Sequence, residues 1–484
     1  MEYASEHGEG MAYRTLSTRQ LREIHSASCQ ILEEIGVLVH HDEAADLLKK
    51  AGAYADPCGR IHISGELLKW AVGRAPSRVT LFNRLGQPAI RLEKSNVSFG
   101  AGSDTLHYLD PFTGERKLWN CADAAAAIRL VDALPNLDFV MSMGMLSDLD
   151  LRMINRAQYA LMLKNSIKPQ VVIAEDRPTL SDVFEMAAAV VGGPERLLSQ
   201  PLFMVYCEPT SPLQMPFNST DKLLLAAEKR IPVNFACGAL AGATTPVTVG
   251  GTVAQANAEA LAGLVVHQLK HPGAPFLYGY GDSPLDMHTM GARYAVPHTI
   301  LLQGAVCDLA RFYQLPSWGY AGCSSSKVFD EQAVMEGTMF TLMGALQGCN
   351  LMHDVFYIES GRTGSLEVLV LSDEVISRVK NILAGIDTGE ESLAVEAVRR
   401  VGPGGNFLGD PHTARHFREN WKESISDFQN YDAWVAGGSK TMGDRIRDRL
   451  REIDERYQPV PLPVEAGPVI DNILQRAEEQ LVIR

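Results

Sequence analysis

The sequence predicts an α/β protein built around a (β/α)8 TIM barrel, and three observations lead to this prediction. Short runs of small, β-branched and aromatic residues alternate with longer segments of helical periodicity over residues 96–385. Several of these runs are apolar throughout, which is typical of parallel strands covered on both faces. Their number matches a closed eight-stranded barrel, whereas an open doubly wound sheet needs no eighth unit.

Residues 1–95 mix short helical and strand patterns and are expected to form a small N-terminal α+β cap. Ser17 can cap a helix whose apolar residues share one face, and Gly36 ends that helix. A second helix is expected over residues 42–51. Short strands are expected near residues 61–63, 79–82 and 89–92.

The barrel itself is expected within residues 96–385. Its predicted strands cover residues 97–102, 138–143, 169–174, 202–207, 232–237, 275–280, 316–321 and 350–355. Its predicted helices cover residues 121–134, 151–166, 178–191, 219–229, 249–270, 294–313, 331–347 and 373–385. Residues 105–119 are expected to form a hairpin inserted after the first strand. Residues 386–484 are expected to form a C-terminal helical extension packed on the outside of the barrel.

Composition excludes several classes of partner. The 484 residues carry 44 basic and 58 acidic side chains, so the net charge is −14, and nucleic acid and anionic membranes are poor partners. The polar start MEYASEHGEG lacks the basic and apolar regions of a signal peptide, and no apolar run is long enough to span a membrane. Eight scattered cysteines without a C-x-x-C pair indicate reduced thiols, so a cytoplasmic location is expected.

Barrel enzymes carry their chemistry at the carboxyl ends of the strands, and here those ends combine carboxylates with aromatic rings. Asp104 and Glu208 follow two of the predicted strands, and His353 lies near the end of the eighth. The aromatic residues at the same face include Tyr206, Tyr280, Trp318 and Phe356. Ring faces and carboxylates both attract positive charge, so this mouth favours a cation. Core packing is the alternative role for each ring.

Other chemistries have weaker support. The sequence contains no H-E-x-x-H motif, and we recognise no zinc-ligand spacing among its 13 histidines, so no metal site is expected. Lys327 follows the seventh strand, where a desolvated lysine can form a Schiff base with a carbonyl substrate. A solvated loop lysine, or an ion pair to Asp330 or Glu331, is the alternative interpretation of Lys327.

Three segments resemble the trimethylamine methyltransferase family: FGAGSDTLHYLDPFTGERK (99–117), GYAGCSSSKVFDEQAVMEG (319–337) and NLMHDVFYIESGRTGSLEVLVLSDEV (350–375). The founding enzymes carry pyrrolysine in the active site, whereas this sequence holds only the twenty standard residues. It therefore resembles the branch without pyrrolysine, whose characterised members demethylate quaternary amines such as glycine betaine. The resemblance implies a (β/α)8 barrel without a tightly bound cofactor, which passes a methyl group to Co(I) of a separate corrinoid protein.

The chemistry of quaternary amines agrees with this resemblance. A quaternary ammonium already carries the charge that lets a neutral amine leave, so no acid or metal is needed to activate it. An aromatic cage can fix the nitrogen substituents and aim one methyl group outward. The cage is expected to comprise Phe356, Tyr280, Trp318 and Tyr206. Glu208 and Asp104 are expected to orient the cage or contact the cation. The expected donors to a betaine carboxylate are His353, Arg362 and Arg311.

The sequence therefore predicts a corrinoid-dependent quaternary amine methyltransferase with glycine betaine as the leading substrate. Proline betaine, carnitine and choline remain alternative substrates, because they differ mostly in their tails. A non-enzymatic betaine-binding subunit and a Schiff-base lyase using Lys327 are the rival functions. A homo-oligomer is also considered, since barrel enzymes of this size often self-associate.

Overall fold

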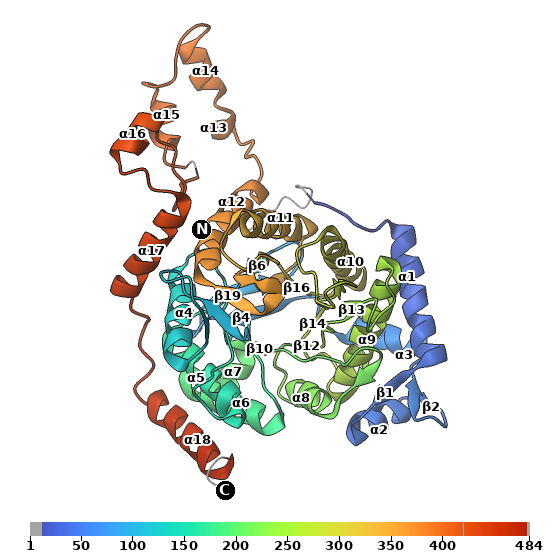
Figure 1. Ribbon diagram of the computed structural model, residues 1–484. Helices are drawn as coiled ribbons and strands as arrows, with labels where there is room; N and C mark the ends of the chain where they lie inside the picture. Colours follow the sequence, from blue (N-terminus) through green and yellow to red (C-terminus); the bar gives the residue numbers. More distant parts are fainter. Residues whose placement is uncertain (1–11, 420, 482–484) are drawn as a thin grey trace.

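A computed structural model describes residues 12–419 and 421–481, and its centre is a closed barrel of parallel strands (Figure 1). Seven strands pair side by side in the order β6-β17-β16-β14-β12-β10-β9. Their bounds are β6 (Ser98–Phe99), β9 (Gln170–Val172), β10 (Phe203–Val205), β12 (Val233–Asn234), β14 (Phe276–Gly279), β16 (Ser317–Tyr320) and β17 (Leu351–His353). Two single bridges, Gly100 to Phe139 and Val140 to Gln170, supply the eighth strand and close the ring. The predicted (β/α)8 barrel is confirmed. The sequence start MEYASEHGEG lies outside the described residues.

Helices form the outer layer of the barrel (Figure 1). They are α4 (Cys121–Ala133), α5 (Ile154–Asn165), α6 (Arg177–Val191), α8 (Phe217–Glu228), α9 (Val249–Lys270), α10 (Pro297–Tyr313), α11 (Glu331–Gln347) and α12 (Leu366–Leu383). The last begins earlier than residue 373, where the sequence predicted it. Ser365 caps its start by accepting a hydrogen bond from the Val368 N–H at 3.3 Å. Residues 368–371 are four consecutive apolar residues, so the helical period is not visible near the start of this helix.

The amino-terminal end of the barrel is plugged by a hairpin of β4 (Val79–Phe82) and β5 (Pro88–Leu92). The Phe82 N–H donates to the Pro201 carbonyl just before β10, at 2.9 Å. The inward side chains of this hairpin share one core with inward residues of the strands: Val79, Leu81, Ile90, Leu92, Phe139, Met141, Val171, Met204, Leu277, Trp318 and Leu351. The plug leaves the carboxyl ends of the strands as the end where a substrate can enter.

The rest of the N-terminal segment packs on α9. Ser17 caps α1 (Thr18–Gln30), as expected, and forms a capping box with Gln20. Gly36 follows the π-helical turn (Ile31–Ile35) that extends α1. The other elements are β1 (Val37–Val39), α2 (Asp42–Lys50), β2 (Tyr54–Ala55), β3 (Arg60–His62) and α3 (Gly65–Arg74). β1 also pairs in parallel with β11 (Gln214–Met215), in the loop after β10. The proposed domain boundary near residue 95 stays a prediction.

A small sheet stands at the carboxyl end of the barrel. The predicted hairpin after the first strand is confirmed as β7 (His107–Leu109) and β8 (Arg116–Leu118). β7 pairs in parallel with β19 (Thr363–Ser365), which in turn pairs with β18 (Tyr357–Ile358). The segments after the first and last barrel strands are therefore joined beside the mouth.

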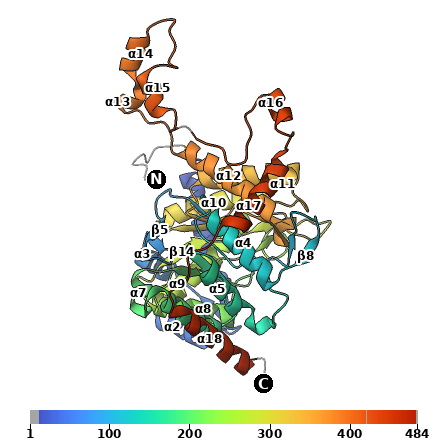
Figure 2. The same cartoon turned by 90° about the vertical axis from the view of Figure 1, so that its left-hand side faces the viewer.

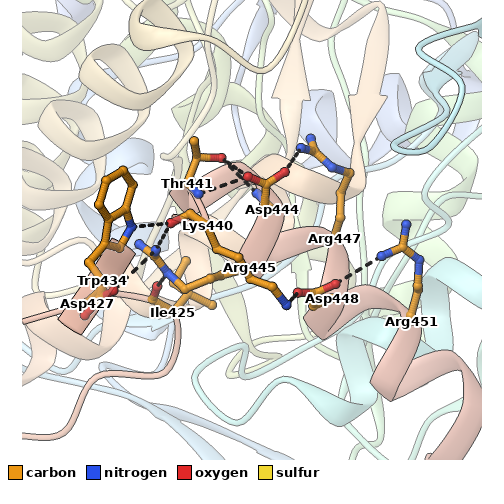
Figure 3. A network of polar contacts seen from close by, with 10 residues as sticks. All are labelled: Ile425, Asp427, Trp434, Lys440, Thr441, Asp444, Arg445, Arg447, Asp448 and Arg451. Carbon is orange, nitrogen blue, oxygen red and sulfur yellow. Dashed lines mark hydrogen bonds and ion pairs between the residues drawn. The ribbon is translucent and has the colours of Figure 1, made fainter. Parts of the chain in front are cut away.

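The C-terminal segment has one part that stands away from the barrel and one part that packs on it. α13 (Glu390–Leu393), α14 (Val395–Val401), α15 (Pro411–His416) and α16 (Tyr431–Ala436) stand away from the barrel in both views (Figures 1 and 2). α17 (Met442–Arg456) packs against α12 and α4, and α18 (Ala466–Leu481) packs against α6. Arg447 of α17 binds Glu367 of α12 at 2.9 Å. Figure 3 shows the polar contacts that order the start of α17, with Asp444 between Thr441 and Arg447.

Within residues 12–419 and 421–481, no helix combines the length and the apolar character that crossing a bilayer requires. The structure describes every cysteine of the chain, and all eight are free thiols.

Candidate active site

A histidine and a tryptophan form the floor of the open end of the barrel. His353 ends β17 and Trp318 lies on the adjacent β16, and their rings stack with centroids 4.4 Å apart and 25° between the planes. Trp318 is fully buried, whereas His353 is partly accessible. The His353 Nδ1 lies 2.5 Å from Asp354 Oδ1. One ring face and one ring nitrogen of His353 are therefore occupied by the protein, and Nε2 is left for a ligand.

A tyrosine and a glutamate form the second part of the site. The Tyr206 ring lies 5.4 Å from Trp318 and 6.4 Å from His353, and its hydroxyl donates a short hydrogen bond to Glu208. Glu208 is an exposed residue, although protein groups surround its carboxylate. This confinement raises the pKa of Glu208, and Asp104 contributes to the rise. Tyr206, Lys222 and His353 oppose it.

Asp104 contributes a second carboxylate. Its Oδ1 accepts hydrogen bonds from the Ser142 hydroxyl and the Gln158 amide, both at 2.9 Å. Burial raises the pKa of Asp104, while these two donors favour the ionised form. Asp104 and Asp354 both adopt left-handed backbone angles, with φ of 55° and 75°. Strained positions of this kind concentrate at functional sites, and here both lie just after barrel strands.

Three further tyrosines, Tyr320, Tyr294 and Tyr357, lie next to these residues. The Tyr320 ring lies 6.2 Å from His353 and 5.8 Å from Tyr294, and its hydroxyl donates to the Asp282 carbonyl at 2.5 Å. The Tyr357 hydroxyl bonds the backbone of Ser103. The Asp354 carboxylate and the Tyr357 ring lie so close to Gly102 that no Cβ fits at that position.

The structure therefore brings together Tyr206, Glu208, Trp318, His353 and Asp104 from the residues selected in the sequence. It places four others elsewhere. Phe356 is fully buried, with its ring against Gly364 and 5.2 Å from the Tyr357 ring. Tyr280 is buried beside Tyr278, with ring centroids 6.1 Å apart.

The two selected arginines also lie outside this cluster. Arg311 lies on α10, where it bonds Asp308 at 2.5 Å and the Gln347 carbonyl at 2.6 Å. Arg362 is exposed in the segment between β18 and β19, at the rim. Arg311 thus links α10 to the end of α11. Arg362 belongs to the small sheet beside the mouth of the barrel, since it lies between β18 and β19.

Lys327 does not meet the requirement for a Schiff-base nucleophile. Its side chain is exposed, and its Nζ donates to the Ser325 carbonyl at 2.8 Å. Asp330 instead caps α11 by accepting from the Ala333 N–H at 3.0 Å. An exposed amine lacks the desolvation that activates a lysine.

Sequence reasoning missed several supporting residues. Gln158 and Ser142 hold Asp104, and Tyr294 packs beside Tyr320. Lys222 is buried on α8, donates to the Ala174 carbonyl and influences Glu208 electrostatically. Gln158, Lys222 and Tyr294 lie on helices or a long loop, where no strand-end rule selects them. Gln158 and Lys222 offered only the weak signal of a polar residue within a helix, and Tyr294 offered none.

Fold and site together define a (β/α)8-barrel enzyme with rings and carboxylates at the open end. A family model described as trimethylamine methyltransferase (MTTB) matches residues 5–481. A trimethylamine methyltransferase MttB of Desulfitobacterium hafniense is 30% identical over 475 residues, which cover 98% of this chain and 95% of that protein. The chain therefore belongs to the trimethylamine methyltransferase family and is a methyltransferase.

Two further comparisons extend this result. A glycine betaine methyltransferase of Desulfitobacterium hafniense is 29% identical over 471 residues, covering 96% of each chain. The monomethylamine methyltransferase MtmB of Methanosarcina barkeri superposes with a TM-score of 0.52 at 10% identity, over 99% of this chain and 91% of that one. The second likeness supports the barrel fold alone.

Proposed function

We propose that this methyltransferase moves a methyl group from a quaternary amine, with glycine betaine as the favoured substrate, to Co(I) of a corrinoid carried by a separate protein. The arrangement of Tyr206, His353 and Glu208 at the open end of the barrel carries this proposal. The absence of pyrrolysine from the sequence and the similarity to a glycine betaine methyltransferase support it.

The accessible groups suit a cation with a polar tail. Tyr206 presents a partly accessible ring and Glu208 an exposed carboxylate, so both favour a positively charged nitrogen near them. Trp318 is fully buried beneath His353, so it acts as a positioning residue. For the betaine carboxylate, His353 Nε2 is the proposed donor in the doubly protonated ring, because the Nδ1 proton is already donated to Asp354.

The reaction asks for orientation more than for acid–base catalysis. The departing amine leaves as a neutral molecule, so no proton has to be delivered to it. Reduced cobalt on the partner protein is the nucleophile, and it has to approach the methyl carbon in line with the carbon–nitrogen bond that breaks. The substrate loses its charge in the transition state, so a site that bound the cation too tightly would slow the transfer. The exposed carboxylate of Glu208, beside rings that fix the nitrogen substituents, fits this requirement.

The setting of the reaction is part of the proposal. All eight cysteines are unpaired, which agrees with a reducing cytoplasm. The corrinoid protein is proposed to dock at the carboxyl end of the barrel, since the hairpin β4–β5 plugs the other end. Self-association of the chain also stays a proposal.

The test mixes purified protein with Co(I) cobalamin and a panel of quaternary and tertiary amines. We expect methyl-cobalt(III) and the demethylated amine to form in equimolar amounts. The absorption spectrum of the cobalamin monitors the first product. His353→Asn should reduce the rate with glycine betaine, and His40→Asn, an exposed control in the N-terminal segment, should not. Turnover of tertiary amines alone by folded protein would overturn the substrate class.

A further inference from the structure

The segment of residues 386–419, here called the arm, lacks a hydrophobic core of its own. It leaves the end of α12 and stands clear of the barrel (Figures 1 and 2). Within the arm, only Ala397 and Asp410 are buried, and apolar side chains such as Ile386 and Leu408 are 87% and 89% exposed. Helices of four to seven residues are not stable without tertiary support. A small unit of this kind commonly depends on a covalent or metal staple.

The arm brings three metal-ligating side chains together. His412 and His416 are one turn apart on α15, so they share a helix face, and their ring centroids lie 4.4 Å apart. Glu391 lies on α13, a separate short helix earlier in the arm. One ligand atom from each of the three residues lies within 4.8 Å of the other two. His416 Nε2 and Glu391 Oε1 are already 3.1 Å apart, a spacing that two ligands of one tetrahedral ion can adopt.

A fourth residue orients this set. The His416 Nδ1 lies 2.7 Å from Glu419 Oε2, so a carboxylate holds one ring nitrogen while the other faces Glu391. This is the carboxylate–histidine–metal arrangement that fixes the tautomer of a ligating imidazole. His412 Nε2 contacts the Glu391 carbonyl oxygen at 3.0 Å, which keeps α15 against α13 before any ion is present.

We propose that Glu391, His412 and His416 bind one Zn²⁺ ion that staples α13 to α15, with water in the fourth position. Two imidazoles, one carboxylate and one water form a zinc site that proteins use mostly for catalysis; here the ligands lie on a projection away from the mouth of the barrel. Arg415 competes for the same carboxylate, since its Nη2 lies 2.5 Å from Glu391 Oε1. The Arg415 side chain is 55% exposed, so it can turn into solvent when the ion binds. This proposal departs from the expectation of no metal site, which gave no weight to the i, i+4 spacing of His412 and His416.

The role of this ion is structural. The ligands lie on a projection outside the barrel, and the residues of the mouth come from other elements (Figure 1). An ion there would fix the fold of the arm and thereby the exposed surface that the arm presents. Metal binding is expected to be independent of the methyl-transfer activity.

The test uses the untagged full chain, stripped with a chelator and dialysed against Zn²⁺ alone. We expect one ion per chain at micromolar free zinc, measured by elemental analysis and titration calorimetry, and slower proteolysis within the arm. His412→Gln combined with His416→Gln should weaken binding about 100-fold or more, and Glu419→Gln about 10-fold to 100-fold. His40→Gln, an exposed histidine outside the arm, is the matched control and should bind like the parent.

A second readout reports the geometry. Co²⁺ in place of Zn²⁺ should show the intense visible bands of a tetrahedral site, and the double histidine variant should lose them. The absence of a stoichiometric ion in the parent, or equal binding by the parent and the double variant, would overturn the proposal. Circular dichroism confirms that each variant is folded.

Discussion

The imidazole of His353 rests on the buried indole of Trp318, with 4.4 Å between the ring centroids. Trp318 belongs to the same core as Leu81 and Ile90 of the hairpin that plugs the barrel. A continuous stack of side chains therefore runs from the plug to the floor of the mouth. Because close-packed cores transmit small displacements, the plug helps to set the height of the His353 ring.

Replacing Trp318 with leucine should impair methyl transfer without removing any group that contacts the substrate. The variant loses the ring stack, worth about 0.5–1.5 kcal/mol beyond its buried area, and lets His353 tilt. We expect kcat/KM for glycine betaine to fall about 10-fold or more, while Trp318→Phe should retain most of it. Steady-state kinetics on protein whose folding is verified by its melting temperature provides the measurement. Equal kinetics for both variants would contradict a positioning role.

Phe356→Ala should act on stability instead of on substrate binding. The ring is fully buried against Gly364, so its loss leaves a cavity and costs about 3–5 kcal/mol of unfolding free energy. We expect the midpoint of urea denaturation to fall clearly, while KM per folded molecule stays close to that of the parent. A raised KM with unchanged stability would instead show that Phe356 belongs to the substrate-binding cage.

The strands were predictable because each is a short apolar run between helical segments, but the direction of individual side chains was not. Alternate residues of a strand point to opposite faces, so one inward residue determines the direction of the others. Leu277 points into the barrel core, and Tyr278 and Tyr280 therefore point outward to the helices. On β16, Trp318 points inward. An aromatic residue near a strand end gives no such information by itself.

The supporting residues were less predictable for a different reason. Gln158 reaches Asp104 from α5, and Lys222 influences Glu208 from α8. These contacts depend on how helices pack against the barrel, which no local pattern in the sequence encodes. The glutamate–tyrosine pair was easier to find, because Tyr206 and Glu208 are two residues apart and point the same way.

Glu208 should make the binding of a cationic substrate depend on pH. Its carboxylate attracts the ammonium only when it is ionised, and its confinement raises its pKa above the ordinary value. As pH falls through this raised pKa, KM for glycine betaine should increase. Glu208→Gln should have a higher KM that does not change over the same pH range. Glu175→Gln, at an exposed glutamate just after β9, is the control and should follow the parent.

Lys327 should be dispensable for the reaction. Its side chain is exposed and bonds only a backbone carbonyl at 2.8 Å, so it is not activated as a nucleophile. Lys327→Met should transfer methyl groups at the parental rate, and borohydride with carbonyl compounds should not label this lysine selectively. Selective labelling together with loss of activity would revive the lyase hypothesis.

Glu374 anchors the segment that leads from the arm to α17. Its Oε2 accepts hydrogen bonds from the Ser424 N–H at 2.7 Å and the Ile425 N–H at 3.0 Å, and its Oε1 accepts from the Ser426 hydroxyl at 2.5 Å. Burial alone would raise the pKa of Glu374, but the hydrogen bonds from Ser426, Ser424 and Ile425 outweigh it and lower the pKa to about 2.

This lowered pKa makes the attachment of the segment sensitive to acid. Because the folded-state pKa lies below the unfolded value of about 4.3, the stabilisation is present above that value and is lost as pH falls towards 2. The hydrogen bonds to the ionised Glu374 therefore contribute to stability at neutral pH. Glu374→Gln should therefore lower stability at pH 7 and remove this part of the acid dependence, measured by thermal unfolding and by proteolysis near residues 421–430. Glu396→Gln, at an exposed ion pair of the arm, should leave both unchanged. Parental cleavage rates in Glu374→Gln would show that the segment is held by α17 alone.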